Sequence, residues 1–528
     1  MVDASSFWFA NPGGGFAYNG VATQSLRFND DDNANLKFDP SGASNQKTWV
    51  CSAWVKKTAN GNNPNAGNDR LIFNTFTAGN NANCAVMGFR NDKPFYSTYG
   101  VEVLVATQVC RDTSAWYHLV WALDTTQATD TNRLKIYLNG VAITSFSVDN
   151  RDNAYLDQDN DLAINNGNEV RIGNAGASSS PLSPFDGYIA EMNFIDGQSF
   201  FSDTSGTANS SFNINSFGEL KNGVWIPKDT SGLTFGTNGF RLDFADNAVD
   251  APESEGTEDT DNIGSDSSGE HNNFTATGIV ASDCAMPDSP ENNFATMNGI
   301  QSSAGTTTFS EGNLRITNSG ARSYNTSTIA VKTGKWYAEM RWDINNSAET
   351  HFVGVSSNPA RIGADPHTTA GTLWWESNGG GYIDGSAVAS AAFSGGVDWG
   401  QHNVTAPEFV IGIALDLDSG TRTVTFTKDG GNSFSKDLPA SFTDHIVFCM
   451  TKYSSSASSQ STWNFGQDST FVGEETATTN ADENGFGAFH TAPPSGFLAL
   501  CSANLPEPTI GPNSDTQAND YFETVTYD

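Results

Sequence analysis

Two acidic residues, Glu191 and Asp196, stand five positions apart in a stretch with the composition of a β-strand, residues 187–197. Retaining glycoside hydrolysis requires two carboxyl groups about 5 to 5.5 Å apart, one acting as nucleophile and the other as acid and base. Between them stands Asn193, which has no carboxylate, and Asp196 has a shorter side chain than glutamate. The stretch is therefore a poor match to a hydrolytic site.

The same stretch carries alternating apolar residues, which predict a strand with one continuous apolar face. This face consists of Tyr188, Ala190, Met192 and Phe194. Packing alone explains such a strand. We therefore predict no catalytic residues and no enzymatic activity, with a polysaccharide depolymerase as the alternative.

Three aspartates, Asp157, Asp159 and Asp161, alternate in a way that could present oxygen ligands to calcium. An EF-hand loop would place glycine at Leu162 and glutamate at Asn168, so an acidic surface loop is the favoured interpretation. The six cysteines are spread singly, without the spacing of a metal site, and are interpreted as buried free thiols. We predict neither a metal nor a cofactor.

The seven histidines are scattered, and none has a serine or cysteine and an acid at a spacing that suggests a catalytic triad. His118 lies between Tyr117 and Leu119 in a strand pattern, which favours a packed structural histidine. The glycine runs lack the strand, helix and lysine context of a phosphate-binding loop.

Adjacent aromatic residues give two weak candidates for binding. Trp374 and Trp375 form either a sugar-stacking platform or part of a core, and because neighbours on a strand point to opposite faces, one of the two must face outward. Phe7, Trp8 and Phe9 form an N-terminal aromatic arm, which either folds onto its own domain or docks on a neighbouring subunit.

The composition limits the class of protein. A chain of 528 residues is too long for a single core, so two or three domains are expected. Its net charge of -34 repels nucleic acid phosphates, which makes nucleic acid an improbable partner. There is no run of eighteen apolar residues, so we expect no insertion into a membrane. The start of the chain lacks a secretory signal pattern, so we expect the protein to be made in a cytoplasm without classical export.

Short period-two patterns separated by Gly, Asn, Asp and Ser predict an all-β protein with little helix. Alternation places Trp49, Cys51, Ala53 and Val55 on one apolar face. Other predicted strands are residues 71–76, 85–89, 101–106, 116–123, 134–138 and 170–173. Asn139-Gly140 is predicted to be a hairpin turn, because both central positions of a type I′ turn need positive φ.

The pattern divides into an N-terminal aromatic arm (1–20), a first antiparallel sandwich (21–246), an acidic linker or strap (247–298), a second sandwich (299–470) and a C-terminal extension (471–528). The linker is too polar to order itself, although Ile263, Phe274, Ile279 and Val280 offer anchors. Its last part, residues 288–298, is named the strap segment. Phe294 and Met297 are apolar anchors there, which predicts an ordered connection.

Several stretches of the first sandwich resemble the laminin-G or concanavalin A-like jelly roll. They are Trp-Tyr-His-Leu-Val at residues 116–120, Leu-Asn-Gly at 138–140 and Gly-Tyr-Ile-Ala-Glu at 187–191. Glucanases of that fold carry Glu-x-Asp-x-x-Glu, from which Asn193 and Asp196 depart.

The resemblance is closer to a variant found in tailed-phage proteins. The stretches that carry it are residues 25–32, 48–57, 188–197, 217–219, 223–228, 236–244, 261–269, 288–298 and 492–510. In longer relatives a Tyr-Phe-x-x-Val-x-Tyr strand opens a further domain, but here residues 521–527 are followed only by Asp528. A function located in that domain is therefore in doubt for this chain.

Four stretches of the second sandwich resemble the SPRY domain, an antiparallel sandwich that works as a binding module. They are residues 334–342, 351–355, 409–418 and 423–430, with a turn predicted at residues 418–420 between the last two.

Together these resemblances imply a non-enzymatic structural protein of a tailed-phage virion, in a tail fibre, head fibre or adhesion appendage, assembled in the host cytoplasm. They imply other virion proteins and a host-surface glycan as partners. Phage fibres are usually homo-oligomers, but the sequence has no heptad stretch, so sandwich faces or the aromatic arm would hold the subunits together. A capsid decoration or tail-hub protein that contacts only virion proteins is the alternative.

Overall fold

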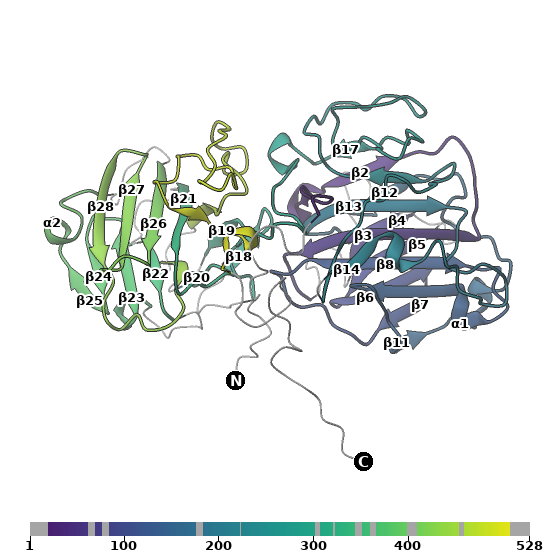
Figure 1. The fold of residues 1–528 in the computed structure, drawn as a ribbon, viewed down its shortest axis with the longest axis horizontal. Helices are drawn as coiled ribbons and strands as arrows, with labels where there is room; N and C mark the ends of the chain where they lie inside the picture. Colours follow the sequence, from purple (N-terminus) through teal and green to yellow (C-terminus); the bar gives the residue numbers. More distant parts are fainter. Residues whose placement is uncertain are drawn as a thin grey trace, which may run out of the picture. The chain divides into compact units, whose positions relative to one another are not determined.

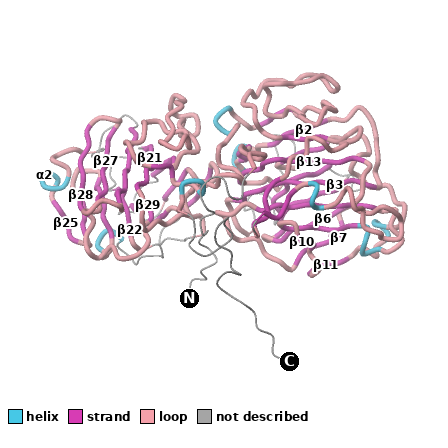
Figure 2. Tube along the Cα trace, viewed as in Figure 1, coloured by secondary structure: helices cyan, strands magenta, loops and turns pink. Residues whose placement is uncertain are grey.

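The computed structural model describes residues 19–61, 69–76, 84–175, 183–221, 223–300, 307–319, 323–343, 351–358, 366–398, 409–452 and 459–506. These residues divide into two compact units, 19–293 and 294–506. Each unit is an antiparallel β-sandwich with its own core, as the sequence predicts (Figure 1). Helix is scarce in the described residues, where α1 (Asp130–Arg133) and α2 (Ser390–Phe393) have four residues each (Figure 2).

The first unit consists of two large sheets and a hairpin. Sheet A contains, in spatial order, β1 (Leu26–Phe28), β13 (Gly187–Asp196), β3 (Thr48–Lys57), β8 (Tyr117–Asp124), β9 (Leu134–Leu138) and β10 (Val141–Ala142), with β16 (Phe240–Leu242) beside β13. Sheet B contains β11 (Phe146–Asp149), β7 (Val101–Ala106), β6 (Lys93–Thr98), β5 (Ala85–Arg90), β4 (Asp69–Thr75), β12 (Val170–Ile172), β2 (Asn35–Phe38) and β17 (Thr275–Thr277). The hairpin pairs β14 (Gly218–Lys221) with β15 (Val224–Pro227).

The central strand β3 follows the predicted alternation. Trp49, Cys51, Ala53 and Val55 are fully buried in the core of the sandwich. The alternate residues Ser52, Trp54 and Lys56 therefore lie on the outer face of sheet A, where further chain segments cover them.

The prediction of one continuous apolar face on β13 is wrong. Met192 and Phe194 belong to the main core, but Tyr188 and Ala190 pack in a separate cluster with Trp54 and Met286. The cause is a β-bulge between Ala190 and Asn193, where Glu191 has φ +44°. Because the extra residue shifts the alternation by one position, the apolar residues before and after it face opposite sides.

The Asn139-Gly140 turn is confirmed. Asn139 has φ +48° and Gly140 has φ +79°, and they connect β9 directly to β10. Both values lie in the left-handed region that a type I′ turn requires.

The acidic segment after residue 246 packs on the first sandwich. β17 adds an edge strand to sheet B, and Ile263, Phe274 and Ile279 are buried, as anchors should be. Val280 is 56% exposed and does not anchor the segment. The predicted linker is therefore largely part of the first unit, since its few apolar residues suffice to hold it.

The second unit also has two sheets. Sheet C contains β18 (Thr307–Ser310), β19 (Arg315–Asn318), β30 (Ser459–Asn464), β21 (Lys335–Asp343), β26 (Phe409–Asp416), β27 (Thr423–Lys428) and β28 (Asn432–Asp437). Sheet D contains β20 (Tyr324–Thr326), β29 (Val447–Lys452), β22 (His351–Ser356), β23 (Thr372–Glu376), β24 (Gly381–Ile383) and β25 (Ser386–Val388). The predicted strands 334–342, 351–355, 409–418 and 423–430 coincide with β21, β22, β26 and β27.

Part of the predicted C-terminal extension belongs to the same sandwich. β31 (Leu498–Ala499) lies parallel to β21, and Phe471 and Phe489 are fully buried. Residues 471–506 therefore complete the second unit.

All six cysteines are buried free thiols. Across the described ranges, no helix is long and apolar enough to cross a membrane.

Candidate functional site

The two predicted carboxylates on β13 enter different hydrogen-bond networks. Glu191 is 2% exposed, and its Oε1 and Oε2 accept hydrogen bonds from Arg241 Nε at 2.6 Å and Nη2 at 3.0 Å. Thr230 Oγ1 also donates to Glu191 Oε1 at 2.9 Å. Burial raises the pKa of Glu191, and the Arg241 ion pair opposes that shift.

Asp196 instead holds loops together. Its Oδ1 accepts from the backbone N–H of Asn45 and from Asn165 Nδ2, and its Oδ2 accepts from the backbone N–H of Asn238. Glu191 and Asp196 thus each have structural partners, and the arrangement gives no support to a hydrolytic pair.

His118 is a packed histidine, as the sequence predicts. Trp225 Nε1 donates to His118 Nδ1 at 2.9 Å, and His118 Nε2 lies 2.9 Å from Ser52 Oγ. Because an indole N–H can only donate, Nδ1 must be the acceptor, so the neutral ring carries its proton on Nε2. Burial lowers the pKa of His118 to about 3. His118 therefore donates to Ser52 and cannot activate it as a nucleophile.

Both candidate tryptophans of the second sandwich are buried, at 0% exposure. Trp375 packs in the inter-sheet core against Phe426 and Phe434. Trp374 lies on the other face of β23 but is covered there by a cluster that includes Tyr324 and Phe352. Neither ring offers an open face to a sugar. Phe7, Trp8 and Phe9 lie outside the described residues.

A different aromatic pair is accessible. The rings of Tyr99 and Tyr155 stack with centroids 5.3 Å apart and an interplanar angle of 25°. Tyr155 is 41% exposed, whereas Tyr99 is half-buried against the core. Tyr99 follows β6 with φ +52°, and Tyr155 belongs to a short 3₁₀ turn, residues 154–156. We name this pair the tyrosine site.

The acidic loop after Tyr155 completes the tyrosine site. Tyr99 Oη donates to the backbone carbonyl of Asp161 at 3.1 Å, and Asn160 Nδ2 donates to the carbonyl of Tyr155 at 3.2 Å. The side chains of Asp157 and Asp159 are exposed. A partly exposed tyrosine followed in the chain by exposed carboxylates suits a ligand with both apolar C–H faces and hydroxyl donors.

Among the described residues, no group of three or more His, Cys, Asp or Glu side chains is placed to hold a metal ion. The interpretation of Asp157, Asp159 and Asp161 as an acidic surface loop stays a prediction.

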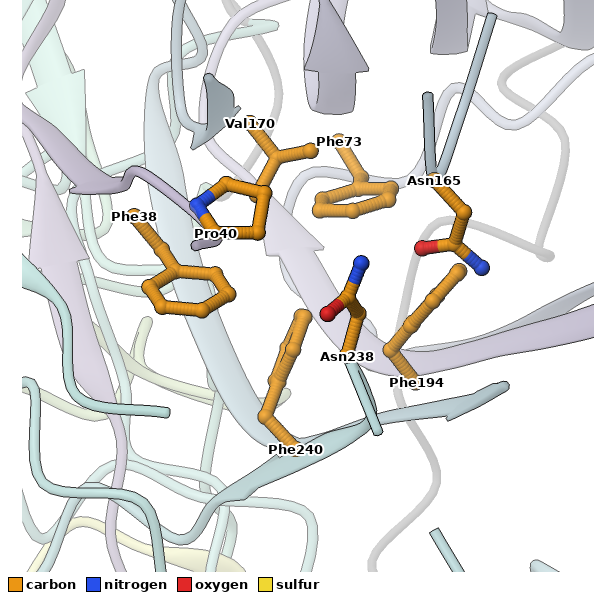
Figure 3. Close-up of a pocket in the computed structure, with 8 residues that line it drawn as sticks. All are labelled: Phe38, Pro40, Phe73, Asn165, Val170, Phe194, Asn238 and Phe240. Carbon is orange, nitrogen blue, oxygen red and sulfur yellow. The ribbon is translucent and has the colours of Figure 1, made fainter. Parts of the chain in front are cut away.

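A small pocket lies elsewhere in the first sandwich, lined by Phe38, Pro40, Phe73, Asn165, Val170, Phe194, Asn238 and Phe240. The phenyl rings lie around the Asn238 amide (Figure 3). Its volume of about 10 Å³ has room for a single water molecule. A sugar ring does not fit, so the pocket is too small to be the main ligand site.

Sequence patterns did not reveal the tyrosine site. Tyr99 stands in a turn and Tyr155 in an irregular loop, so neither belongs to a periodic pattern. The one available signal was an aromatic residue two positions before the aspartate series, at Tyr155.

No protein-family model matches the chain, and no curated protein matches it. Solved structures resemble parts of it. The SPRY domain of human HERC1 is 20% identical, and the match covers 30% of this chain and 90% of that one with a TM-score of 0.24. A heptameric SAP-like pentraxin from Limulus polyphemus is 11% identical, covering 38% and 83% with a TM-score of 0.26.

A candidate carbohydrate-binding protein from Bacteroides ovatus is 16% identical, covering 49% of this chain and 59% of that one with a TM-score of 0.30. These likenesses concern fold over part of the chain, and no function is transferred from them. The fold itself follows from the sheets: the chain is an all-β protein of two antiparallel sandwiches.

Proposed function

We propose that this chain is a non-enzymatic structural protein of a tailed-phage virion, in a tail fibre, head fibre or adhesion appendage, that binds a host-surface glycan at the tyrosine site. The observation that carries the glycan part is the exposed ring of Tyr155, stacked on Tyr99 and followed by exposed aspartates. The virion part is supported by the sequence resemblance to tailed-phage proteins. Other virion proteins and further copies of the chain are the expected partners.

The charge of the protein narrows the glycan class. With a net charge of -34 and three exposed aspartates, Asp157, Asp159 and Asp161, shortly after Tyr155 in the chain, an acidic polysaccharide is repelled. A neutral or amine-bearing glycan can instead donate its hydroxyl or ammonium hydrogens to these carboxylates. The proposed ligand is therefore a neutral or amine-bearing surface sugar.

Binding of the purified full-length protein to host cells and to their neutral polysaccharide tests the glycan part. Tyr155→Ala removes the stacking face and is expected to weaken binding about tenfold, while Tyr155→Phe retains it. Leu220→Ala is a matched control, because Leu220 is 69% exposed in the β14–β15 hairpin of the same unit. Equal binding by wild type and Tyr155→Ala would exclude the tyrosine site.

Two further measurements separate the alternatives. Electron microscopy of particles with the labelled protein locates it in the virion, and its absence from particles would refute the virion assignment. A decoration or tail-hub protein is expected to show no binding to host cells. Release of reducing ends from the polysaccharide would identify a depolymerase instead.

A further inference from the structure

The outer face of sheet A contains a lysine in an unusual setting. Lys56 on β3 is 0% exposed, because the chain before the second unit covers it. Its Nζ lies 2.7 Å from Asp288 Oδ2 and 2.7 Å from Asn293 Oδ1. Asp288 is also 0% exposed and Asn293 is 1% exposed. An amine, a carboxyl group and a carboxamide thus meet in a site closed to solvent.

The surroundings fix the orientation of the three groups. Asn293 Nδ2 donates to the backbone carbonyl of Ser114 at 2.8 Å, which turns its Oδ1 towards Lys56. Trp116 Nε1 donates to Asp288 Oδ1 at 3.2 Å and leaves Oδ2 for the lysine. The ring of Tyr188 lies 5.7 Å from Lys56 Nζ and forms an apolar wall.

This setting favours the reactive form of the lysine. Burial lowers the pKa of Lys56, and the charge and hydrogen bond of Asp288, together with the charge of Asp112, only partly oppose this effect. In a site of low polarity, transfer of the proton from Lys56 to Asp288 replaces two buried charges with a neutral amine and a carboxylic acid. A desolvated neutral lysine is a competent nucleophile.

Lys56 Nζ lies close to the carbon atom that it would attack. Since Cγ and Oδ1 of Asn293 are joined by a carbonyl bond, Cγ lies within about 4 Å of Lys56 Nζ. Groups held at such distances in the right orientation react as if at very high concentration.

We propose that Lys56 and Asn293 form an intramolecular isopeptide bond, with Asp288 as the group that moves the protons. Lys56 Nζ attacks Asn293 Cγ while the Asp288 carboxylic acid donates its proton to Oδ1. The carboxylate then takes a proton from Nζ, the carbonyl re-forms, and the Cγ–Nδ2 bond breaks as Nδ2 leaves as ammonia. Asp288 returns to its starting state, and no oxidant or reductant is required.

A neighbouring lysine shows what an ordinary buried ion pair looks like here. Lys57 is also 0% exposed, and its Nζ contacts Asp92 Oδ1 and the backbone carbonyl of Cys110. No carboxamide is among these two partners. The Lys57 ammonium group is thus paired with a carboxylate and a backbone carbonyl and has no side-chain amide to attack in these contacts. Lys57 is therefore a matched control for Lys56.

The proposed bond has a structural consequence. It joins the central strand β3 to the last residue of the first unit, across 237 positions of sequence. A pull exerted on the chain at Phe294 would then reach β3 through a covalent link. This inference does not depend on glycan binding or on a place in a virion.

Intact-mass measurement of the denatured, reduced full-length protein tests the proposal. The wild type is expected to weigh one ammonia less than its sequence, and a tryptic digest is expected to contain a branched peptide joining Lys56 to Asn293. Lys56→Arg, Asp288→Asn and Asn293→Ala are each expected to give the full mass of their sequence. Lys57→Arg is expected to keep the loss of ammonia.

The wild type decides the question without relying on the folding of any variant. A folded wild type with the full sequence mass overturns the proposal. So does a loss of ammonia without the branched peptide, which indicates cyclisation of an asparagine. A loss of water with Lys56 joined to Asp288 overturns the choice of Asn293.

Discussion

At the scale of single residues, buried carboxylates in this protein serve as fixed acceptors. Glu191 is held by Arg241 and Thr230 on the outer side of β13. Glu339 on β21 is fully buried and holds the segment of His490 and Thr491 by accepting both of their backbone N–H groups. A carboxylate inside a sandwich is stable only when donors surround it, so removing a partner has a large cost.

Substitution of Arg241 by methionine tests the ion pair. It leaves Glu191 buried without its cation, and the first unit is expected to lose about 3 to 5 kcal/mol of unfolding free energy. Urea unfolding at neutral pH measures the change. The double variant Glu191→Gln with Arg241→Met is expected to recover most of the loss, because it buries no charge. If the free energy of unfolding of Arg241→Met lies within about 1 kcal/mol of the wild-type value, the ion pair does not have the proposed role.

Glu339 makes the stability of the second unit depend on pH. Burial raises its pKa to about 7, whereas an unfolded glutamate titrates near 4.3. Between these values the folded protein binds more protons than the unfolded chain, so the free energy of unfolding falls as pH rises. The contribution of Glu339 is complete below about pH 4.3 and is lost as pH passes about 7.

Comparison with Glu339→Gln isolates this effect, since glutamine does not ionise. The difference in free energy of unfolding between wild type and Glu339→Gln is expected to fall by about 3 kcal/mol as the pH rises from 4.5 to 7. Unfolding curves across this range provide the measurement. A difference that stays constant with pH would show that Glu339 titrates normally.

At the scale of elements, the strap segment is a connection that is ordered along its length. Its first residues, such as Asp288, are buried in the first unit. From Phe294 onward the chain is anchored in the second unit, where Ala295 N donates to the Leu500 carbonyl and Met297 N to the Asn313 carbonyl. Apolar anchors and backbone hydrogen bonds thus replace the regular pairing that Pro290 prevents.

Limited proteolysis distinguishes the strap segment from the acidic loop before it. Cleavage near Glu255, which is exposed, is expected to be much faster than cleavage near Asn293, which is 1% exposed. The reason is that a protease needs a locally unfolded stretch. Mass spectrometry of early fragments gives the order of the cuts. Equal rates at the two positions would mean that the strap segment opens as readily as the loop.

At the scale of the whole molecule, the two sandwiches are separate cores on one strongly acidic chain. The core of the first unit is built on aromatic side chains such as Phe194 and Phe240, and that of the second on others such as Trp375 and Phe426. Because each core buries its own apolar surface, each sandwich can unfold as a cooperative unit.

Calorimetry is therefore expected to show two transitions. Arg241→Met should lower the melting temperature of one transition, and Glu339→Gln should change only the other, because each residue belongs to a different unit. A single transition that both variants shift together would show that the two cores are coupled.

Features that depend only on neighbouring residues could be predicted from the sequence alone. Alternation placed Trp49 and Val55 in the core, and Asn139-Gly140 set the β9–β10 turn, because side-chain direction and positive φ are local properties. The four strand patterns of the second sandwich were likewise correct.

Where these local pieces meet depends on the fold of the whole sandwich. The β-bulge at Glu191 has no sequence signature, and it reversed the side on which Tyr188 faces. The stacking of Tyr99 on Tyr155, and the meeting of Lys56 with Asn293, join residues far apart in the chain. Such contacts follow from how whole sheets and loops pack, which periodicity along the chain does not encode.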